Sequence, residues 1–353
     1  MSFSCVDCFS GAGGLSIGFS RAGFDVVLSF DNDRHCIETQ RLNPRHFKHD
    51  IALASIDEML GNVLLRQIRK KKGELDLLAG GPPCQGFSVQ RIGGDEDHRN
   101  DLVLKYLQLI EEVMPKYFLI ENVKGFAGKR GEEFLEQVAG KAEKLGYHLH
   151  LSVLDAQDFG VPQRRQRIII VGEVRRSGNS PLFKFPKPTT PIGKRNTVRM
   201  AIGGMPPPPE DGSDHPLFVH HRRDRLSELN KRRLRALRPG QGREHLPAEL
   251  LADCHRTSPE IIGHRNVYGR MSWDDVAPTI TARFDSFTRG LFGHPKQTRT
   301  ISLREGAELQ TFPSDMVFAG TKVDIARQIG NAVPVRLATA IGKSIISCLG
   351  KAR

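Results

Sequence analysis

The first 174 residues alternate between short apolar runs and segments with helical spacing, and this pattern constrains the fold more than any other feature of the chain. Runs typical of strands lie at 4–9, 25–30, 75–79, 117–120, 148–154 and 167–171, and helical spacing covers 15–22, 34–43, 101–113 and 132–145. Such alternation predicts an α/β fold with a mainly parallel sheet and helices on both of its faces.

The texture of the sequence changes after Val171. Residues 180–215 are rich in proline, residues 220–243 are dense in arginine, and few periodic segments occur before about residue 300. This composition is typical of a domain built largely from loops.

Helical patterns return near 302–310 and 333–348. We therefore expect two domains, because 353 residues can bury one large core and a smaller one. The larger domain is expected at 1–185, completed by 322–353, and the smaller, loop-rich domain at 186–321.

The positive charge is concentrated in one segment. Residues 175–299 hold 23 Lys and Arg against 12 Asp and Glu, which accounts for +11 of the net charge of +12. A polyanionic partner, most simply a nucleic acid, explains this segregation. A solvated surface with a bias towards arginine is the alternative.

The six cysteines are too few for a disulfide scaffold of this size, which favours a reducing cytoplasm. Cys5 and Cys8 form a C-x-x-C without a second pair, so we expect buried thiols and no metal site. No apolar run reaches the length of a membrane span, and the N-terminus lacks the pattern of a secretory signal. We therefore expect a soluble protein with no membrane partner.

A glycine-rich turn joins the first strand to the first helix in Asp7–Phe19, DCFSGAGGLSIGF. Glycines let the backbone approach a ligand closely, and Asp31, at the end of the next strand, is placed to bind a ribose diol. The dinucleotide fingerprint G-x-G-x-x-G is absent, because Ser16 stands at its last position. This favours an adenosine ligand without a pyrophosphate, such as S-adenosylmethionine, over NAD. A tight turn without a ligand is the alternative.

Cys84 follows an apolar strand and a stiff Pro82-Pro83 corner in the stretch GGPPCQGFS. A catalytic thiol needs exposure, which a loop after a strand provides. Glu121 ends another apolar strand, and Arg165 and Arg167 are expected on one side of a third. A helix-capping carboxylate and paired surface arginines would be the structural alternative for these groups.

Thiolate, carboxylic acid and guanidinium are together the set that activates a pyrimidine ring. A thiolate that adds to C6 of cytosine makes C5 nucleophilic, while a carboxylic acid at N3 and an arginine at O2 stabilise the charge that develops in the ring. Because the ring faces are stacked in duplex DNA, the base must be extruded first.

These motifs, in this order, resemble those of the DNA (cytosine-5) methyltransferases of the compact bacterial or phage type. DCFSGAGG is similar to the family's cofactor motif, GGPPCQGFS to its catalytic loop, ENV to its carboxylate motif and QRRQR to its Gln-x-Arg-x-Arg motif. REGAELQTFP and QIGNAVP resemble its two closing motifs. The resemblance implies a Rossmann-like S-adenosylmethionine-dependent methyltransferase sheet, with 186–321 as the target-recognition domain.

The resemblance also assigns roles to matching residues. Cys84 is the nucleophile, Glu121 the partner of N3 and Arg167 the partner of O2, with Arg165 in a structural or supporting role. The cofactor-binding residues are expected to be Phe9, Gly11, Gly13, Gly14, Asp31, Asp50, Ile51, Pro82, Leu102, Asn331 and Ala332. The DNA-binding residues are expected to be Gln85, Ser88, Arg222, Arg223, Arg270, Thr279, Thr281 and Arg283. Where the family often has a bulky apolar residue against adenine, this chain has Asn32.

The sequence therefore predicts a cytoplasmic, monomeric enzyme that transfers a methyl group from S-adenosylmethionine to C5 of cytosine in a specific duplex DNA sequence. A cognate restriction endonuclease, acting separately, is a candidate partner. A tRNA cytosine-5 methyltransferase is one rival, and a catalytically silent DNA-binding regulator is another. The recognition sequence does not follow from the residues, since base readout depends on which side chains reach the groove edges.

Overall fold

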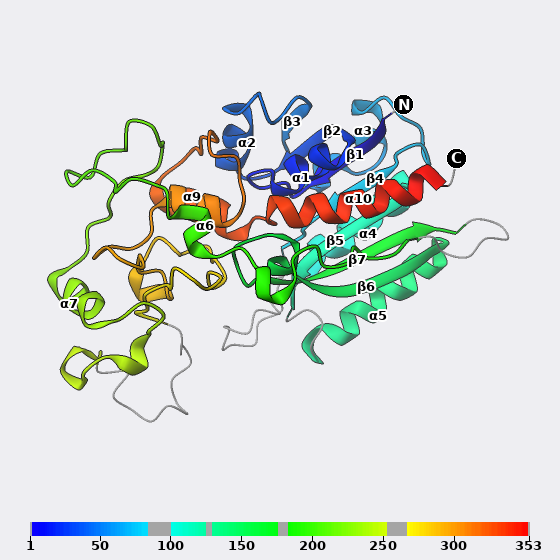
Figure 1. Ribbon diagram of the computed structural model, residues 1–353. Coiled ribbons are helices and arrows are strands. Elements are labelled where there is room, and N and C mark those ends of the chain that lie inside the picture. Colours follow the sequence, from blue (N-terminus) through cyan, green and yellow to red (C-terminus); the bar gives the residue numbers. More distant parts are fainter. Residues whose placement is uncertain (1, 84–99, 125–128, 176–182, 253–266, 352–353) are drawn as a thin grey trace. The chain divides into compact units, whose positions relative to one another are not determined.

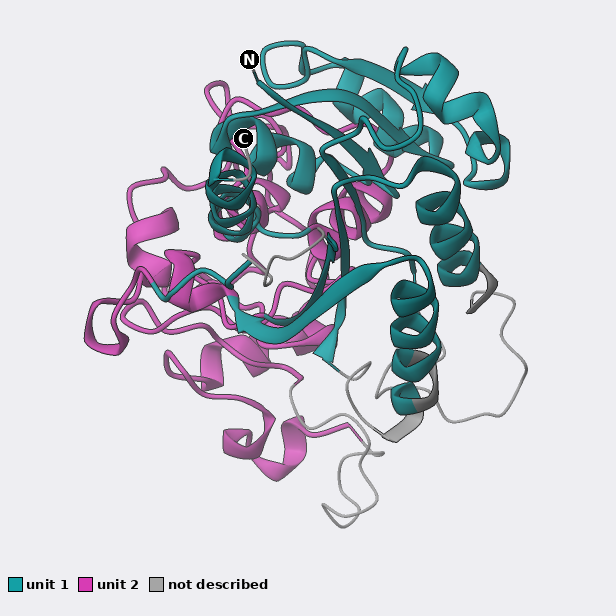
Figure 2. Cartoon of the chain, turned by 90° about the vertical axis from the view of Figure 1, so that its right-hand side faces the viewer, with its two compact units in different colours: residues 1–155, 166–188, 333–353 teal, residues 156–165, 189–332 magenta. Residues whose placement is uncertain are grey.

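The computed structural model describes residues 2–83, 100–124, 129–175, 183–252 and 267–351. The chain divides into two compact units, which Figure 2 colours separately. Unit 1 comprises 1–155, 166–188 and 333–353, and unit 2 comprises 156–165 and 189–332. The short segments 156–165 and 322–332 thus cluster with unit 2, outside the range 186–321 expected for the smaller domain.

Unit 1 is built on a seven-stranded sheet in the order β3-β2-β1-β4-β5-β7-β6 (Figure 1). The strands are β1 Phe3–Cys8, β2 Phe24–Asp31, β3 Asp50–Leu53, β4 Leu77–Gly80, β5 Tyr117–Val123, β6 Tyr147–Asp155 and β7 Gln166–Val174. The first five strands of that order are parallel, whereas β7 runs antiparallel to both β5 and β6. The predicted α/β class and mainly parallel sheet are confirmed.

Helices cover both faces of this sheet (Figure 1). The helices of unit 1 are α1 Gly14–Ala22, α2 Arg34–Arg41, α3 Asn62–Gln67, α4 Asn100–Val113, α5 Lys129–Lys144 and α10 Val335–Lys351. Alternate strand residues such as Val6, Leu28 and Phe118 join residues of α3, α4 and α5 in one apolar core. Since successive strand side chains point to opposite faces, the intervening positions face α1 and α10.

Helices α1 and α10 pack so closely that a Cβ on Gly18 would overlap the side chain of Ala338. By length and composition alone, the helical stretch Lys322–Lys351 could cross a membrane, which differs from the expectation that no apolar run reaches that length. Its apolar window is 56% buried within the protein, as in the core helix of a soluble protein, so it is weak evidence for a span.

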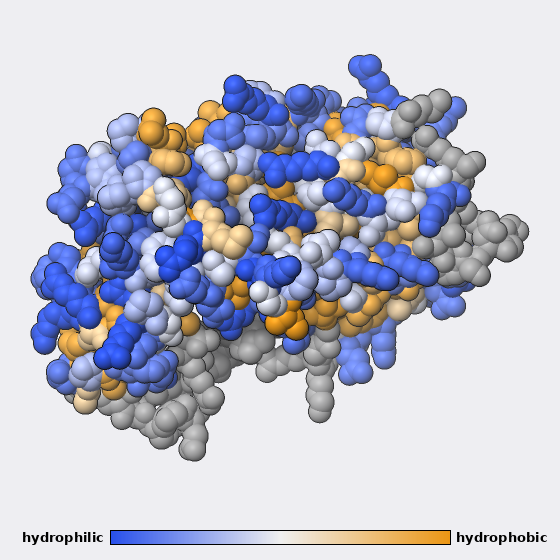
Figure 3. Space-filling model, in the orientation of Figure 1, coloured by the Kyte–Doolittle hydropathy of each residue, from blue (hydrophilic) through white to orange (hydrophobic). Residues whose placement is uncertain are grey.

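Unit 2 is mostly irregular. Its helices are α6 Val198–Ile202, α7 Glu228–Ala236, α8 Leu303–Leu309 and α9 Lys322–Asn331, and only isolated β-bridges occur in its described residues. Short 3₁₀ turns of the chain lie at Asp57–Met59, Ala156–Phe159, Ile192–Lys194, Arg243–His245, Ala248–Leu250 and Phe287–Arg289. The surface seen in Figure 3 is largely hydrophilic, with apolar residues scattered among polar ones.

Inside unit 2, buried arginine side chains form hydrogen bonds with carbonyl groups that would be paired with backbone N–H groups in a β-sheet. Arg270 donates to the carbonyl oxygens of Leu234, Leu237, His294 and Gln297. Arg304 donates to those of Val219, Pro313 and Met316. Irregular chain leaves carbonyl groups without partners, and an unpaired buried carbonyl is costly, so guanidinium groups serve as internal donors.

Arg299 and Glu305 form a buried ion pair in unit 2. Two guanidinium nitrogens lie 2.6 and 2.7 Å from the two carboxylate oxygens, and both side chains are 1% exposed. Ser302 starts α8, and its backbone N–H and that of Glu305 close a capping box. Burial raises the pKa of Glu305, but the hydrogen bonds and charge of Arg299 outweigh it and hold that pKa below its ordinary value.

We predict that Glu305→Gln lowers the free energy of unfolding by about 3–5 kcal/mol, because it leaves the buried Arg299 charge without its partner. Urea unfolding near neutral pH measures this, with Glu228→Gln at an exposed surface pair as the matched control. A depressed carboxyl pKa stabilises the fold above the unfolded-state value of about 4.3. The difference between wild type and variant should therefore shrink as the pH falls through the lower, folded-state pKa. A loss no larger than the control's contradicts the prediction.

Candidate active site

The candidate site lies at the carboxyl edge of the parallel strands of unit 1. Register places the end of β1 at Cys8 beside Gly80 of β4, and Gly80 beside Ile120 of β5. Because parallel strands end at the same edge, the segments that follow β1, β2, β4 and β5 converge there.

The glycine-rich turn after β1 has a left-handed backbone at Phe9, Gly11 and Gly13, with φ of 55°, 52° and 80°. Gly11 donates its backbone N–H to a carboxylate oxygen of Asp31 at 2.8 Å, which ties the turn to the end of β2. A Cβ on Gly13 would overlap the ring of Phe47, whereas the space above Gly11 is open. The turn therefore needs glycine at Gly13 for packing and leaves room for a ligand at Gly11.

The side chain of Gln40 holds the same turn through hydrogen bonds. Gln40 was not among the site residues expected from the sequence. Its side chain is fully buried, and its amide nitrogen donates to Ser10 Oγ and to the carbonyl oxygen of Gly11, both at 2.8 Å. Ser29 donates to its amide oxygen at 2.6 Å. A buried glutamine in an otherwise amphipathic α2 was the available signal, but its partners are distant in sequence.

Asp7 and Asp31 are carboxylates with raised pKa values at this edge. Asp7 accepts from the backbone and hydroxyl of Ser16, 2.9 and 2.6 Å away, and burial raises its pKa to about 7. Burial also raises the pKa of Asp31, against the backbone hydrogen bonds from Asp33 and Gly11. Asp7 thus holds the start of α1, and Asp31 faces the turn.

Glu121 and Arg167 form an ion pair across two strands. Arg167 Nε lies 2.9 Å from Glu121 Oε1, and both side chains are largely buried. In the antiparallel register Val123 is opposite Arg167, so Glu121 and Arg167 are diagonal neighbours on one face. Burial lowers the pKa of Arg167, and the Glu121 charge opposes that shift, so the guanidinium stays charged. The pair is a buried acid and cation side by side.

The chain that leaves β4 passes directly over Glu121. A Cβ on Gly81 would come within 3.1 Å of Glu121 Oε2, and Asn122 donates its side-chain amide to the carbonyl oxygen of Pro82 at 3.1 Å. The loop is therefore held beside the carboxylate at Gly81 and Pro82. Three predicted site residues lie outside the described residues, namely Cys84, Gln85 and Ser88.

Arg165 does not share a strand face with Arg167, contrary to expectation, because β7 begins at Gln166. Arg165 belongs to unit 2 and is 1% exposed. It donates to the carbonyl oxygens of Ile280 and Gly330 at 2.9 and 2.8 Å. These contacts give Arg165 a structural role.

The remaining cofactor candidates fall into two groups. In unit 1, Gly14 opens α1, Pro82 is buried, Leu102 is half-buried on α4, and Asp50 and Ile51 start β3, opposite Leu28 and Ser29 of β2. Asn331 and Ala332 lie at the C-terminal end of α9 in unit 2, and their cofactor role stays a prediction. No cluster of His, Cys, Asp and Glu suited to a metal ion occurs in the described part of the chain.

The candidate DNA contacts of unit 2 differ in exposure. Arg270 is buried and serves internal carbonyl groups, so its predicted DNA contact loses its support. Thr279 donates to the carbonyl oxygen of Arg164, Thr281 is exposed, and Arg283 pairs with Asp285 at 3.1 Å. Thr281 and Arg283 are therefore the exposed members of this group, and Arg283 already has an ion-pair partner.

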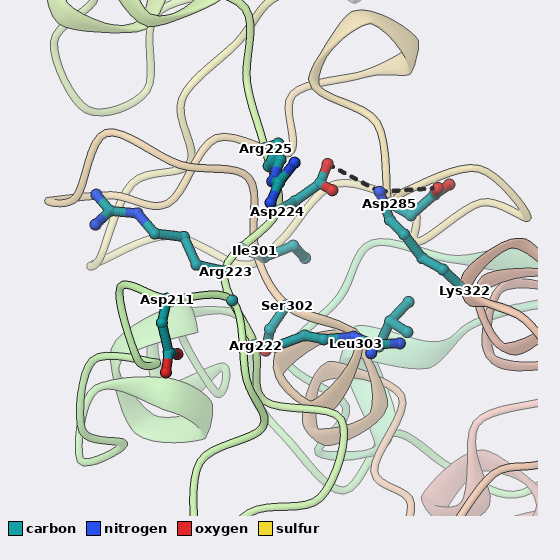
Figure 4. Close-up of a pocket in the computed structure, with 11 residues that line it drawn as sticks. Asp211, Arg222, Arg223, Asp224, Arg225, Asp285, Ile301, Ser302, Leu303 and Lys322 are labelled. Carbon is teal, nitrogen blue, oxygen red and sulfur yellow. Dashed lines mark ion pairs between the residues drawn. The ribbon is translucent and has the colours of Figure 1, made fainter.

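Unit 2 has two adjoining hollows: Arg223 borders both, and Arg222 borders the smaller one (Figure 4). The larger, of about 420 Å³, is the arginine hollow, and its basic residues are Arg223, Arg225, Lys231 and Arg235. Arg223 pairs with Glu210, and Figure 4 shows Lys322 between Asp224 and Asp285 in the smaller hollow. Among the described residues, Arg225 and Arg235 form no ion pair.

Comparison with known proteins gives a consistent result. A family model described as C-5 cytosine-specific DNA methylase matches residues 3–347. The chain is 35% identical to the "Type II methylase M.HgiDII" of Herpetosiphon aurantiacus over 96% of this chain and 94% of that protein. It is 36% identical to the "Type II methyltransferase M1.HphI" of Haemophilus parahaemolyticus over 98% and 87%.

Solved structures agree in fold. A prophage-encoded E. coli chain described as a candidate DNA modification methyltransferase superposes with a TM-score of 0.71 at 25% identity, over 99% of this chain and all of that one. The S. pombe Dnmt2 methyltransferase gives a TM-score of 0.62 at 17% identity over 98% and 99%, which shows the fold alone.

Proposed function

The chain belongs to the C-5 cytosine-specific DNA methylase family and is a DNA (cytosine-5)-methyltransferase, and we propose that Cys84, Glu121 and Arg167 carry its reaction on an extruded cytosine. The observation that supports this assignment is the Glu121–Arg167 pair beneath the chain that leads to Cys84. A pure DNA-binding regulator would have no use for a buried acid and cation at that place.

In this proposal the Cys84 thiolate adds to C6 of cytosine, and the electron pair displaced from the C5–C6 bond makes C5 nucleophilic. Glu121 takes up a proton as the base enters and, as a carboxylic acid, donates a hydrogen bond or that proton to N3. Arg167 donates to O2, so both groups stabilise the charge of the ring. After C5 takes the methyl group, a base accepts the proton from C5. The electron pair of the C5–H bond then re-forms the C5–C6 double bond, and the C6–S bond breaks to release the thiolate. The ion pair keeps Arg167 aligned before the base arrives.

Family members use S-adenosylmethionine, and the residues of unit 1 fit an adenosine ligand. The half-buried carboxylate of Asp31 lies beside a turn in which the space next to Gly11 is open. We propose that Asp31 binds the ribose and that Phe9 and Gly11 line the cofactor. When bound, this cofactor supplies the methyl group.

We propose duplex DNA as the substrate and unit 2 as the target-recognition domain. The basic segment 175–299 lies mostly in unit 2, and the arginine hollow offers unpaired guanidinium groups to phosphate. The relatives are named as Type II enzymes, so we propose a restriction-modification role in which a cognate endonuclease acts separately. A monomer in the bacterial cytoplasm is the expected form.

We predict that DNA with 5-fluorocytosine at the target position traps the enzyme covalently, and only when the methyl donor is present. Fluorine cannot leave C5 as a proton does, so the thiol stays bonded to C6 once C5 is methylated. Denaturing electrophoresis and peptide mapping should place the adduct on Cys84, and Cys84→Ser should give none. An adduct without the donor, or one on Cys36, would show a different nucleophile or order of steps.

We predict that Asp31→Ala weakens cofactor binding by roughly 10- to 150-fold, because a hydrogen bond to a charged group contributes about 1.5–3 kcal/mol. DNA binding should change much less. Calorimetry measures both, and Asp33→Ala, which removes the N-cap of α2 but keeps Asp31, is the control. Equal cofactor affinities in the wild type and Asp31→Ala would remove Asp31 from the site.

We predict that Arg225→Gln/Arg235→Gln reduces the salt dependence of DNA binding. Each lost phosphate contact lowers the slope of log K against log salt by about 0.9, so the double change should lower it by about 1.8. Titrations at several salt concentrations measure the slope, with Arg21→Gln on an exposed turn of α1 as the matched charge control. If the hollow does not meet DNA, the slopes of all three proteins will coincide.

A further inference from the structure

Two buried glutamines in unit 2 form a polar pair that the proposed reaction does not use. Gln163 lies in the loop between β6 and β7, and Gln310 ends α8. Both side chains are fully buried, and Gln163 Nε2 donates to Gln310 Oε1 at 2.9 Å. A buried amide pair is costly unless each of its polar atoms has a partner.

The other polar atom of each glutamine forms hydrogen bonds with the backbone of a different segment. Gln163 Oε1 accepts from the backbone N–H of Ile280 at 2.8 Å. Gln310 Nε2 donates to the carbonyl oxygens of Ile329 and Ala332 at 2.6 and 3.3 Å. The donor at one end and the acceptors at the other fix the orientation of both amides. The two side chains therefore link segment 277–281 to residues 329–332 through a continuous series of hydrogen bonds.

The two segments also touch directly. A Cβ on Gly330 would overlap the backbone of Thr281, so only glycine permits this approach. Arg165 bridges the same segments a second time, through the carbonyl oxygens of Ile280 and Gly330. The distance between segments 277–281 and 329–332 is therefore set by the glutamine pair, by Arg165 and by Gly330.

We propose that Gln163 and Gln310 are positioning residues that couple DNA binding to cofactor binding. Segment 277–281 ends at the exposed residue Thr281, which is expected to contact DNA. Residues 329–332 include Asn331 and Ala332, which are expected to contact the cofactor. A displacement of one segment is transmitted to the other through the amide pair. This proposal rests on the proposed function of the chain, together with the DNA role expected for Thr281 and the cofactor role expected for Asn331 and Ala332.

The consequence is a reciprocal affinity effect. DNA should tighten the binding of S-adenosylhomocysteine, an unreactive analogue of the donor, and the analogue should tighten the binding of DNA by the same factor. Couplings of this kind typically reach about 5- to 150-fold. The ratio of analogue dissociation constants without and with target DNA, from calorimetry, gives the coupling factor without any turnover.

Gln163→Glu tests the pair through pH. A neutral carboxylic acid keeps both bonds, because its carbonyl oxygen accepts from Ile280 and its hydroxyl donates to Gln310. An ionised carboxylate has no proton to donate and would place two acceptors face to face. Burial raises the pKa of such a carboxyl. The variant should therefore match the wild-type coupling factor at low pH and lose it, towards one, as the pH rises.

Two comparisons separate positioning from general damage. Gln328→Glu makes the same change at another buried amide of unit 2, which donates to the carbonyl oxygen of Ala319, and should keep the coupling at every pH at which it stays folded. Gln163→Met keeps the volume without charge, and should bind DNA and analogue separately yet couple them weakly at all pH values.

The proposal is overturned if the wild type shows no coupling, if Gln163→Met keeps the full coupling, or if Gln328→Glu loses it as Gln163→Glu does. Thermal melting of each variant at each pH identifies the conditions in which the protein is folded, and Gln163→Met supplies the result where Gln163→Glu unfolds. The 5-fluorocytosine trap is read separately on the wild type, so a failure of the proposed function is distinguished from a failure of the coupling.

Discussion

The pairing of buried carbonyl groups with donors is the constraint on which the rest of unit 2 depends. A sheet pairs its own backbone, as unit 1 does, but an irregular chain of this length has no ladder to do so. Arg165, Arg270 and Arg304 are the donors that let loops close over a core. The same residue type thus serves the interior of the unit and, at the arginine hollow, its surface.

The two units differ in how much of their structure could be predicted from the sequence. Periodicity located the main strands and helices of unit 1, because burial of one face imposes the period on the sequence. It missed the short β3 and α3 and, in unit 2, the helices α6, α7 and α9. Arginine density predicted a basic surface, yet Arg270 is interior, since a charge count does not reveal which arginines have carbonyl partners.

The candidate site shows the same division. Glu121, Arg167 and the turn at Gly11 could be found from the sequence because motifs keep chemically required residues at fixed places along the chain. Gln40 and the pair Gln163–Gln310 could not, because their partners come from segments far apart in sequence. Support for a site is set by tertiary packing, which one sequence does not display.

The motif QRRQR straddles the boundary of the two units, with Gln163 and Arg165 in unit 2 and Arg167 in unit 1. Unit 2, the proposed recognition domain, is therefore discontinuous in sequence, and its smaller piece, 156–165, lies between two segments of unit 1. Exchange of specificity between relatives, whether by recombination or by design, then has to carry two segments together. If residues 189–332 alone were transferred, the host's own segment 156–165 would have to form hydrogen bonds with backbone groups of a different protein. The buried contacts of Gln163 and Arg165 would then be mismatched in the hybrid.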